Sequence, residues 1–223
     1  ELNPELISIY FNIGQIYQKN GKIEKAIEAY KKALLSNENE ALLYCNVAQC
    51  YTELKKPDEA IILYNKALEL DKNLDTVYVK LGNIYKNQKK PEEAIEEYKK
   101  AVQINHDNPM VFCNMGNMYK TLNKTKEAID SYQKALEVNP KLTSAYYNLA
   151  IIYDEERNTS EAIKNYEKVL SLSPGIADVY VRLGRLYAEK KNLKASVRAF
   201  NKAIEIEPDN KEAKSGLENM IIL

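Results

Sequence analysis

Residues 75–108 read DTVYVKLGNIYKNQKKPEEAIEEYKKAVQINHDN, and this stretch decides the fold because it recurs along the whole chain without insertions. A glycine or alanine returns every 34 residues, and a tyrosine follows three residues after each of them. A fixed period of this length indicates a stacked-repeat architecture. The small residues are Gly14, Ala48, Gly82, Gly116, Ala150 and Gly184.

Each period holds two groups of apolar residues with helical spacing. In residues 75–108 the first group includes Tyr78 and Leu81, and the second includes Ala94 and Tyr98. Spacings of three and four residues place each group on one face of a helix. Between the groups, Pro91 is followed by two glutamates, a pattern typical of a helix start. We therefore predict an all-α fold in which every period is a helix–turn–helix hairpin.

The period divides the chain into six full repeats. Residues 1–6 match the tail of a repeat, so we hypothesise that the chain was cut from a longer array. Residues 211–223 keep a helical pattern but carry Lys214 and Glu218 at positions that are apolar or small elsewhere. We expect them to form a polar-backed capping helix, as solenoids require at their ends. The predicted repeats are residues 7–40, 41–74, 75–108, 109–142, 143–176 and 177–210.

The aromatic residues indicate how the hairpins pack. Of the 17 tyrosines, all but Tyr147 fall at three positions of the period. An aromatic side chain opposite a glycine or alanine on the partner helix predicts knob-into-hole packing between helices. We expect these tyrosines to form the core, in preference to a platform for stacking a ligand.

The amino-acid composition argues against several classes of function. Lys plus Arg and Asp plus Glu number 32 each, a balance that argues against a dedicated binder of nucleic acid or anionic membranes. No apolar run approaches the roughly 18–20 residues that span a bilayer. Cys45, Cys50 and Cys113 lack CxxC spacing, which indicates thiols in a reducing compartment rather than disulfides or a zinc site. We expect a cytoplasmic protein, with the nucleus as the alternative location.

The chain offers little for catalysis. His106 is the only histidine, and it occupies the position where other repeats carry a loop proline. A solvent-exposed turn residue is therefore the preferred interpretation over a catalytic base next to Cys113. No glycine-rich phosphate-binding motif is present. We predict a non-enzymatic protein without cofactor or metal.

At this point the pattern resembles the tetratricopeptide repeat (TPR) family. The matching sites in the third repeat are Tyr78, Leu81-Gly82, Tyr85, Ala94, Tyr98 and Ala101. The resemblance implies a right-handed α-solenoid whose concave groove, lined by the first helix of each repeat, binds an extended peptide or a partner helix. Ser196 departs from the usual alanine, and we expect it to loosen the last repeat slightly.

Two rows of polar residues follow the first aromatic of each repeat, and helical phase directs both rows toward the groove. Asparagine is over-represented in them although it disfavours helix interiors by about 0.5 kcal/mol. A side-chain amide offers both a donor and an acceptor to the backbone of a bound chain. One row is Asn12, Asn46, Lys80, Asn114, Asn148 and Arg182, and the other is Gln15, Gln49, Asn83, Asn117, Ile151 and Arg185.

An apolar floor is expected beside the amides, from Phe11, Cys45, Val79, Cys113, Tyr147 and Val181. The lysines and arginines near the rows outnumber Asp154 and Asp178, so we expect a mildly basic groove that prefers neutral or acidic segments. Our predicted peptide-binding residues are Asn12, Gln15, Asn46, Gln49, Lys80, Asn83, Asn114, Asn117, Tyr147, Asn148, Arg182 and Arg185.

The amide ladder is similar to that of O-linked N-acetylglucosamine transferases, with matches at Asn12, Asn46, Asn114 and Asn148. It also resembles in part the carboxylate clamp of co-chaperones, although Cys113 and Asp178 replace two lysines.

Three hypotheses remain open. The chain is a protein-binding scaffold, the substrate-selecting part of a larger enzyme such as that transferase, or a self-associating assembly subunit. The sequence leaves the oligomeric state and the partner's motif undetermined.

Overall fold

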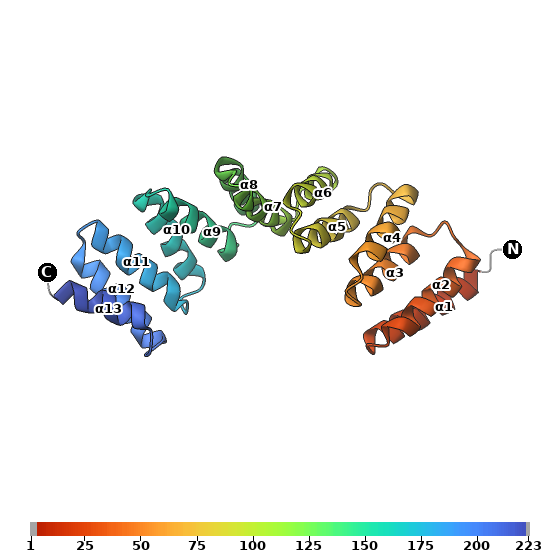
Figure 1. Ribbon diagram of the computed structural model, residues 1–223, viewed down its shortest axis with the longest axis horizontal. Helices are drawn as coiled ribbons and strands as arrows, with labels where there is room; N and C mark the ends of the chain where they lie inside the picture. The colour runs from red at the N-terminus through yellow and green to blue at the C-terminus, as the bar shows by residue number, and fades with distance from the viewer. Residues whose placement is uncertain (1–3, 222–223) are drawn as a thin grey trace. The chain divides into compact units, whose positions relative to one another are not determined.

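The computed structural model describes residues 4–221, and in this range the chain forms thirteen α-helices and no strands. The helices pair into successive antiparallel hairpins (Figure 1). The chain divides into two compact units, Glu1–Asp107 and Asn108–Leu223. Within the described residues it is therefore an all-α solenoid of tandem hairpins.

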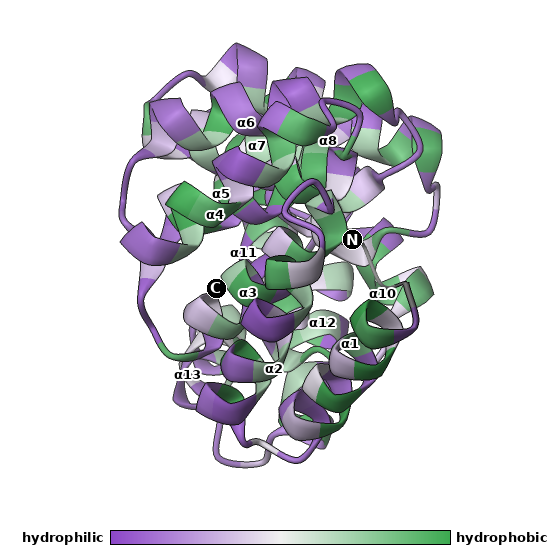
Figure 2. Ribbon diagram, turned by 90° about the vertical axis from the view of Figure 1, so that its right-hand side faces the viewer, coloured by the Kyte–Doolittle hydropathy of each residue, from purple (hydrophilic) through white to green (hydrophobic). Residues whose placement is uncertain are grey.

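The first unit contains three hairpins. Its helices carry apolar residues on one side and polar residues on the other, which Figure 2 shows as green and purple turns along each ribbon. The six helices are α1 (Pro4–Lys19), α2 (Ile23–Ser36), α3 (Ala41–Glu53), α4 (Pro57–Leu70), α5 (Asp75–Asn87) and α6 (Pro91–Ile104).

The second unit contains three further hairpins and one terminal helix. Its seven helices are α7 (Pro109–Thr121), α8 (Thr125–Val138), α9 (Thr143–Glu155), α10 (Thr159–Leu172), α11 (Ala177–Glu189), α12 (Leu193–Ile206) and α13 (Lys211–Ile221).

Every hairpin turns in the same way. The second residue after the end of the first helix has a positive φ. The backbone N–H of the next residue donates a hydrogen bond to the carbonyl five residues before it, as in Lys90 N–H to Tyr85 O at 2.9 Å. This is the Schellman arrangement that closes a helix C-terminus. Only the first hairpin places glycine at the left-handed residue. The six positions are Gly21, Lys55, Lys89, Asn123, Arg157 and Lys191.

The core of each hairpin is an aromatic side chain of the second helix set against a small residue of the first. The Tyr98 and Tyr132 side chains are fully buried. A Cβ atom added to Gly82 would lie 2.5 Å from the Tyr98 ring, and one added to Gly116 would lie 2.6 Å from the Tyr132 ring. The glycines therefore make room for the rings, as expected for knob-into-hole packing.

Consecutive hairpins join through a repeated interface between a second helix and the next first helix. In the α2–α3 interface, Ala26, Tyr30 and Ala33 share one apolar cluster with Leu43 and Val47. Corresponding clusters join α4 to α5, α10 to α11 and α12 to α13. This stacking positions the first helices of each unit side by side.

The ends of the array differ from its middle. Residues 4–6, which match a repeat tail in sequence, form the first turn of α1, and residues 1–3 lie outside the described range. Helix α13 covers α12 through Ala213, in line with a capping role. Ser196, expected to loosen the last hairpin, is fully buried and donates a 2.7 Å hydrogen bond to the Gly184 carbonyl. Its hydroxyl thereby ties α12 to α11.

Candidate functional site

The predicted binding residues all lie on the first helix of each hairpin, and none of them is fully buried. We call the surface that they form the first-helix face, and it forms one patch in each unit. All twelve residues are half-buried or exposed, so each is accessible in part. The patch of the first unit comprises Asn12, Gln15, Asn46, Gln49, Lys80 and Asn83. The patch of the second comprises Asn114, Asn117, Tyr147, Asn148, Arg182 and Arg185.

The second amide row has a structural role that the sequence interpretation did not foresee. The Tyr98 hydroxyl donates to Asn83 Oδ1 at 2.8 Å, and the Tyr132 hydroxyl donates to Asn117 Oδ1 at 2.7 Å. Burial raises the pKa of both hydroxyls above the usual 10.0, so they stay protonated donors at neutral pH. Each bond fixes the amide oxygen toward the core and leaves the amide NH₂ without a partner among residues 4–221.

The first two hairpins vary this arrangement. The Tyr64 hydroxyl donates to Gln49 Oε1 at 3.3 Å, but Gln49 also donates its Nε2 to Glu53 at 3.3 Å, so both ends of this amide are engaged. In the first hairpin the Tyr30 hydroxyl reaches Gln18 instead of Gln15, at 3.1 Å. Gln15 is exposed and makes no hydrogen bond within the described residues.

The fifth hairpin breaks the pattern because Ile151 occupies the amide position. The Tyr166 side chain is fully buried, and its hydroxyl has no hydrogen-bond partner in the described part of the chain. Burial raises the pKa of Tyr166 to about 12, and the positive charge of the nearby Arg182 guanidinium opposes this rise. A buried unpaired hydroxyl is unfavourable.

In the first row, one asparagine links neighbouring hairpins. Asn148 on α9 donates its Nδ2 to Asn117 Oδ1 on α7 at 3.1 Å, so the Asn117 oxygen accepts two donors. Asn46 instead donates to the carbonyl of Leu42 on its own helix, at 2.7 Å. Asn12 and Asn114 make no hydrogen bond with residues 4–221. This row therefore contains amides that are hydrogen-bonded within the protein and amides that make no hydrogen bond with the described residues.

A pocket of about 300 Å³ opens on the first-helix face between α1 and α3. Phe11 and Leu42 contribute its apolar part, and Asn12 and Glu40 lie at its polar rim. Leu42 is more than half exposed, which leaves its side chain accessible to a bound group. Of the residues expected to form an apolar floor, Phe11 lines this pocket, whereas Cys113 and Val181 are buried, at 3% and 2% exposed, because they pack inside the second unit.

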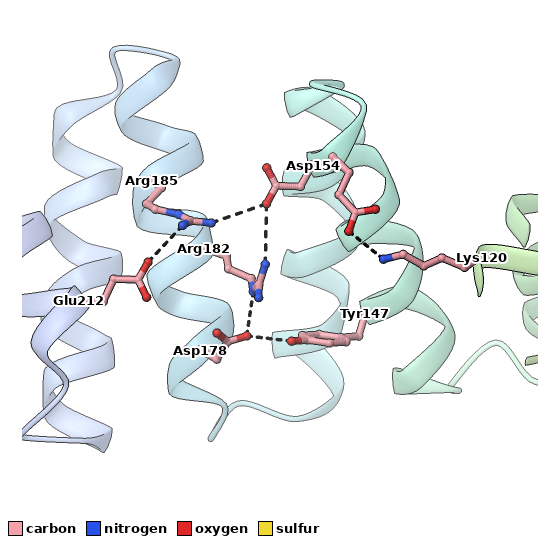
Figure 3. A network of polar contacts seen from close by, with 8 residues as sticks. Lys120, Tyr147, Asp154, Asp178, Arg182, Arg185 and Glu212 are labelled. Atoms are coloured by element: carbon pink, nitrogen blue, oxygen red, sulfur yellow. Dashed lines mark hydrogen bonds and ion pairs between the residues drawn. The ribbon is translucent and has the colours of Figure 1, made fainter. Parts of the chain in front are cut away.

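Charges on the first-helix face of the second unit are paired (Figure 3). Arg182 Nε lies 2.9 Å from Asp178 Oδ2, and the Tyr147 hydroxyl donates to the same oxygen at 2.9 Å. Arg185 Nη1 lies 3.1 Å from Glu212 Oε1 on α13. Asp154 lies between the two arginines, with longer contacts of 4.0 Å to Arg182 and 3.9 Å to Arg185.

A separate ion pair joins α7 to α9, where Lys120 Nζ lies 2.9 Å from Glu155 Oε1. Lys120, Arg182 and Arg185 are the cations near the amide rows in this part of the face, and each has a carboxylate beside it. The expected excess of positive charge is therefore absent from the second unit. The prediction missed the carboxylates of Glu155 and Glu212, because they lie on neighbouring helices and their position beside these cations is not visible in the sequence.

No other cluster suggests chemistry within residues 4–221. His106 is exposed in the loop between α6 and α7. The three cysteines are unpaired, and burial raises the pKa of Cys45 to about 11 and of Cys50 to about 12. No group of metal-ligating side chains occurs in this range, and none of its helices is long and apolar enough to cross a membrane.

Comparison with known proteins identifies the repeat. Sequence models described as tetratricopeptide repeat match residues 5–73, 109–142, 155–219, and 63–96 with 131–164, and a TPR repeat model matches residues 82–123. Together these matches cover most of the chain. The chain belongs to the tetratricopeptide repeat family.

Solved TPR structures share its fold. YrrB, described as a TPR protein with an unusual peptide-binding site, is 30% identical, with 86% of this chain and 99% of YrrB aligned at a TM-score of 0.72. A MamA structure is 32% identical over 75% of this chain and 97% of MamA, with a TM-score of 0.68. PilF of Pseudomonas aeruginosa is 22% identical over 96% and 98% of the two chains, with a TM-score of 0.74, and shows the fold alone. No curated protein sequence matches the chain significantly.

TPR proteins are generally non-catalytic scaffolds that bind other proteins or peptides. The fold of this chain is therefore that of a protein-interaction scaffold.

Proposed function

We propose that the TPR array binds an extended peptide along the first-helix face, with side-chain amides holding the peptide backbone. The supporting observation is the orientation of Asn83 and Asn117. Their oxygens are fixed by buried tyrosine hydroxyls at 2.8 and 2.7 Å, so their NH₂ groups are preorganised donors. A peptide carbonyl accepts such a donor whatever its side chain, and preorganised groups lose little freedom on binding.

Each patch favours a different kind of peptide segment. In the first unit, the pocket formed by Phe11 and Leu42 suits an apolar side chain of the peptide beside the free amide of Asn12. In the second unit, the arginines and Lys120 already have carboxylate partners, so this patch suits a neutral polar segment. Binding of a highly charged segment there would require breaking the existing ion pairs.

The similarity to YrrB supports this proposal, because that TPR protein is described as having a peptide-binding site and is 30% identical over most of both chains. The substrate-selecting and self-associating alternatives remain predictions, together with a cytoplasmic location.

Selection from a phage-displayed library of random peptides tests the proposal. Asn12→Ala and Asn114→Ala remove amides that make no hydrogen bond within residues 4–221. Each variant should therefore bind the selected peptides at least fivefold more weakly, while the stability of the protein stays unchanged. Asn201→Ala, on the exposed side of second helix α12, is the matched control and should bind normally. Unchanged affinity in both ladder variants, or equal loss in the control, would contradict the proposal.

A further inference from the structure

A second pocket, of about 570 Å³, opens in the second unit between α10 and α12, with residues of α11 between them. We call it the α10–α12 pocket. On α11 it is lined by Tyr180, Leu183 and Tyr187, which form one stripe of the helix because they are spaced by three and four positions. Arg182 and Arg185 of the first-helix face each follow a lining residue by two positions, which is about 200° of helical rotation. The pocket and the first-helix face therefore lie on opposite sides of α11.

The apolar part of the α10–α12 pocket combines two tyrosine rings with two leucines. Leu183 is 3% exposed, whereas Tyr180, Tyr187 and Leu170 are half-buried, so part of each of these three side chains is accessible. The Tyr187 hydroxyl donates a hydrogen bond to the Glu167 carboxylate, which holds the ring against α10. Burial and this carboxylate raise the pKa of Tyr187 to about 12, so the hydroxyl stays a protonated donor at neutral pH. The pocket thus presents a preformed apolar surface that suits a large side chain.

The charged side chains that line the pocket have a polar partner, with one exception. Lys202 Nζ lies 2.6 Å from Glu205 Oε2, and Glu167 accepts the Tyr187 hydroxyl. Arg198 is exposed and makes no ion pair or hydrogen bond with residues 4–221. Its positive charge lies close enough to Tyr187 to oppose the rise in the pKa of that hydroxyl. The pocket therefore places an unpaired guanidinium beside an apolar surface.

This unpaired cation is not a general feature of the repeat. One period earlier, Lys164 occupies the position of Arg198, and it pairs with Glu161 at 3.3 Å. In the four preceding repeats the position holds Glu28, Ile62, Glu96 and Asp130. Arg198 therefore distinguishes the sixth hairpin from the others.

The pocket also has the length of a short peptide. Its lining residues on α12 run from Ala195 to Glu205, a distance of about 15 Å at 1.5 Å per residue. An extended chain rises about 3.3 Å per residue, so roughly four to five peptide residues fit along α12. The guanidinium of Arg198 offers a fork of donors that matches the two oxygens of a carboxylate. Neighbouring side chains of one peptide can therefore reach the tyrosine rings and the guanidinium together.

We propose that the α10–α12 pocket binds an extended acidic segment of another protein, in which a large apolar side chain stands next to a glutamate or aspartate. The apolar side chain packs on Tyr180 and Tyr187, and burial of this surface favours binding. The carboxylate pairs with Arg198, the one charged group of the pocket that lacks a partner in the described chain. The proposal is independent of peptide binding on the first-helix face, because the two surfaces share no residue.

The probe is the peptide acetyl-Gly-Phe-Glu-Leu-Gly-amide, whose blocked ends leave the glutamate as its only charge. Titration into protein with ¹³C-labelled tyrosine rings should shift the Tyr180 and Tyr187 resonances saturably. A second peptide with glutamine in place of glutamate keeps the shape and loses the charge. It should bind about fivefold more weakly, because it cannot form the charge-assisted pair with Arg198.

Protein variants give the matching test. Arg198→Gln should weaken the glutamate peptide about fivefold and leave the glutamine peptide unaffected, because the two changes remove the same interaction. Lys164→Gln removes a lysine at the same position one period earlier and should leave binding of the glutamate peptide unchanged. Asn12→Ala and Asn114→Ala, which test the first-helix face, should also leave it unchanged. Unchanged circular dichroism will show that each variant folds.

Three results overturn the inference. The first is the absence of saturable shifts at Tyr180 and Tyr187. The second is equal weakening by Arg198→Gln and Lys164→Gln, because a general attraction to positive charge would then explain the binding. The third is equally tight binding of free 3-phenylpropionate, because a small aromatic carboxylate would then be the occupant.

Discussion

At the scale of single residues, the buried tyrosine hydroxyls distinguish the repeats from one another. The hydroxyls of Tyr98 and Tyr132 have amide acceptors, whereas the Tyr166 hydroxyl has none in the described chain. An intramolecular hydrogen bond contributes about 1 kcal/mol net, and an unpaired buried group has an unfavourable desolvation term. Identical substitutions in two repeats should therefore have different effects.

Tyr132→Phe should lower the free energy of unfolding by about 1 kcal/mol, because it removes the hydrogen bond to Asn117. Tyr166→Phe should be neutral or slightly stabilising, because it removes only an unpaired hydroxyl. Urea unfolding followed by circular dichroism measures both. An equal loss in the two variants would show that the Tyr166 hydroxyl has a partner after all.

Ile151→Asn should provide the missing acceptor. The free-energy coupling between Ile151→Asn and Tyr166→Phe in a double-mutant cycle should be about 1 kcal/mol, because the new amide helps only when the hydroxyl is present. The same pair of changes at the unconnected sites Ile62 and Tyr166 should show no coupling.

At the scale of elements, most of the fold was predictable and part of the site was not. The 34-residue period places one helix pair in every repeat, since spacings of three and four mark both helices of residues 75–108. The use of the Asn83 and Asn117 oxygens was not predicted, because it depends on distances between two helices. A signal was present, as each amide precedes its tyrosine by 15 residues, and Ile151 breaks that rule.

The hairpin turns also carry strain that their sequence does not suggest. Lys55, Lys89, Asn123, Arg157 and Lys191 adopt positive φ values, which side chains other than glycine disfavour by roughly 1–2 kcal/mol. Gly21 shows the residue that suits the position.

Lys89→Gly should raise the free energy of unfolding by about 0.5–1 kcal/mol, because relief of the left-handed strain exceeds the entropy lost by glycine. Lys90→Gly is the neighbouring control. Its φ of −112° suits any residue, so glycine there should be neutral or destabilising. Urea midpoints of the two variants give the comparison, and a lower midpoint for Lys89→Gly would contradict the prediction.

At the scale of the whole molecule, stability depends on a set of buried phenols distributed over both units. Burial raises the pKa of Tyr30, Tyr64 and Tyr166 from 10.0 to about 12. Groups of this kind favour the folded state while they are neutral. Their contribution is complete below pH 10, where folded and unfolded chains both keep the proton.

We expect alkaline unfolding between about pH 10 and pH 12. In this range the unfolded chain releases phenolic protons that the folded chain retains, so the free energy of unfolding falls as pH rises. Tyrosinate absorbance and helical circular dichroism should change together for the buried set. Full ionisation of all tyrosines near pH 10 with helicity intact would contradict this expectation.

The Asn117 side-chain oxygen accepts two hydrogen bonds, and this connects peptide binding to the rigidity of the array. It joins Tyr132 in the core to Asn148 on the adjacent first helix, while the nitrogen of the same amide faces outward under our proposal. A peptide that takes this nitrogen would hold the amide still, and with it the contact between two hairpins. Thermodynamic reciprocity then requires that any change that loosens this contact weakens peptide binding by the same factor. The strength of the contact between the two hairpins would therefore depend on whether a peptide is bound.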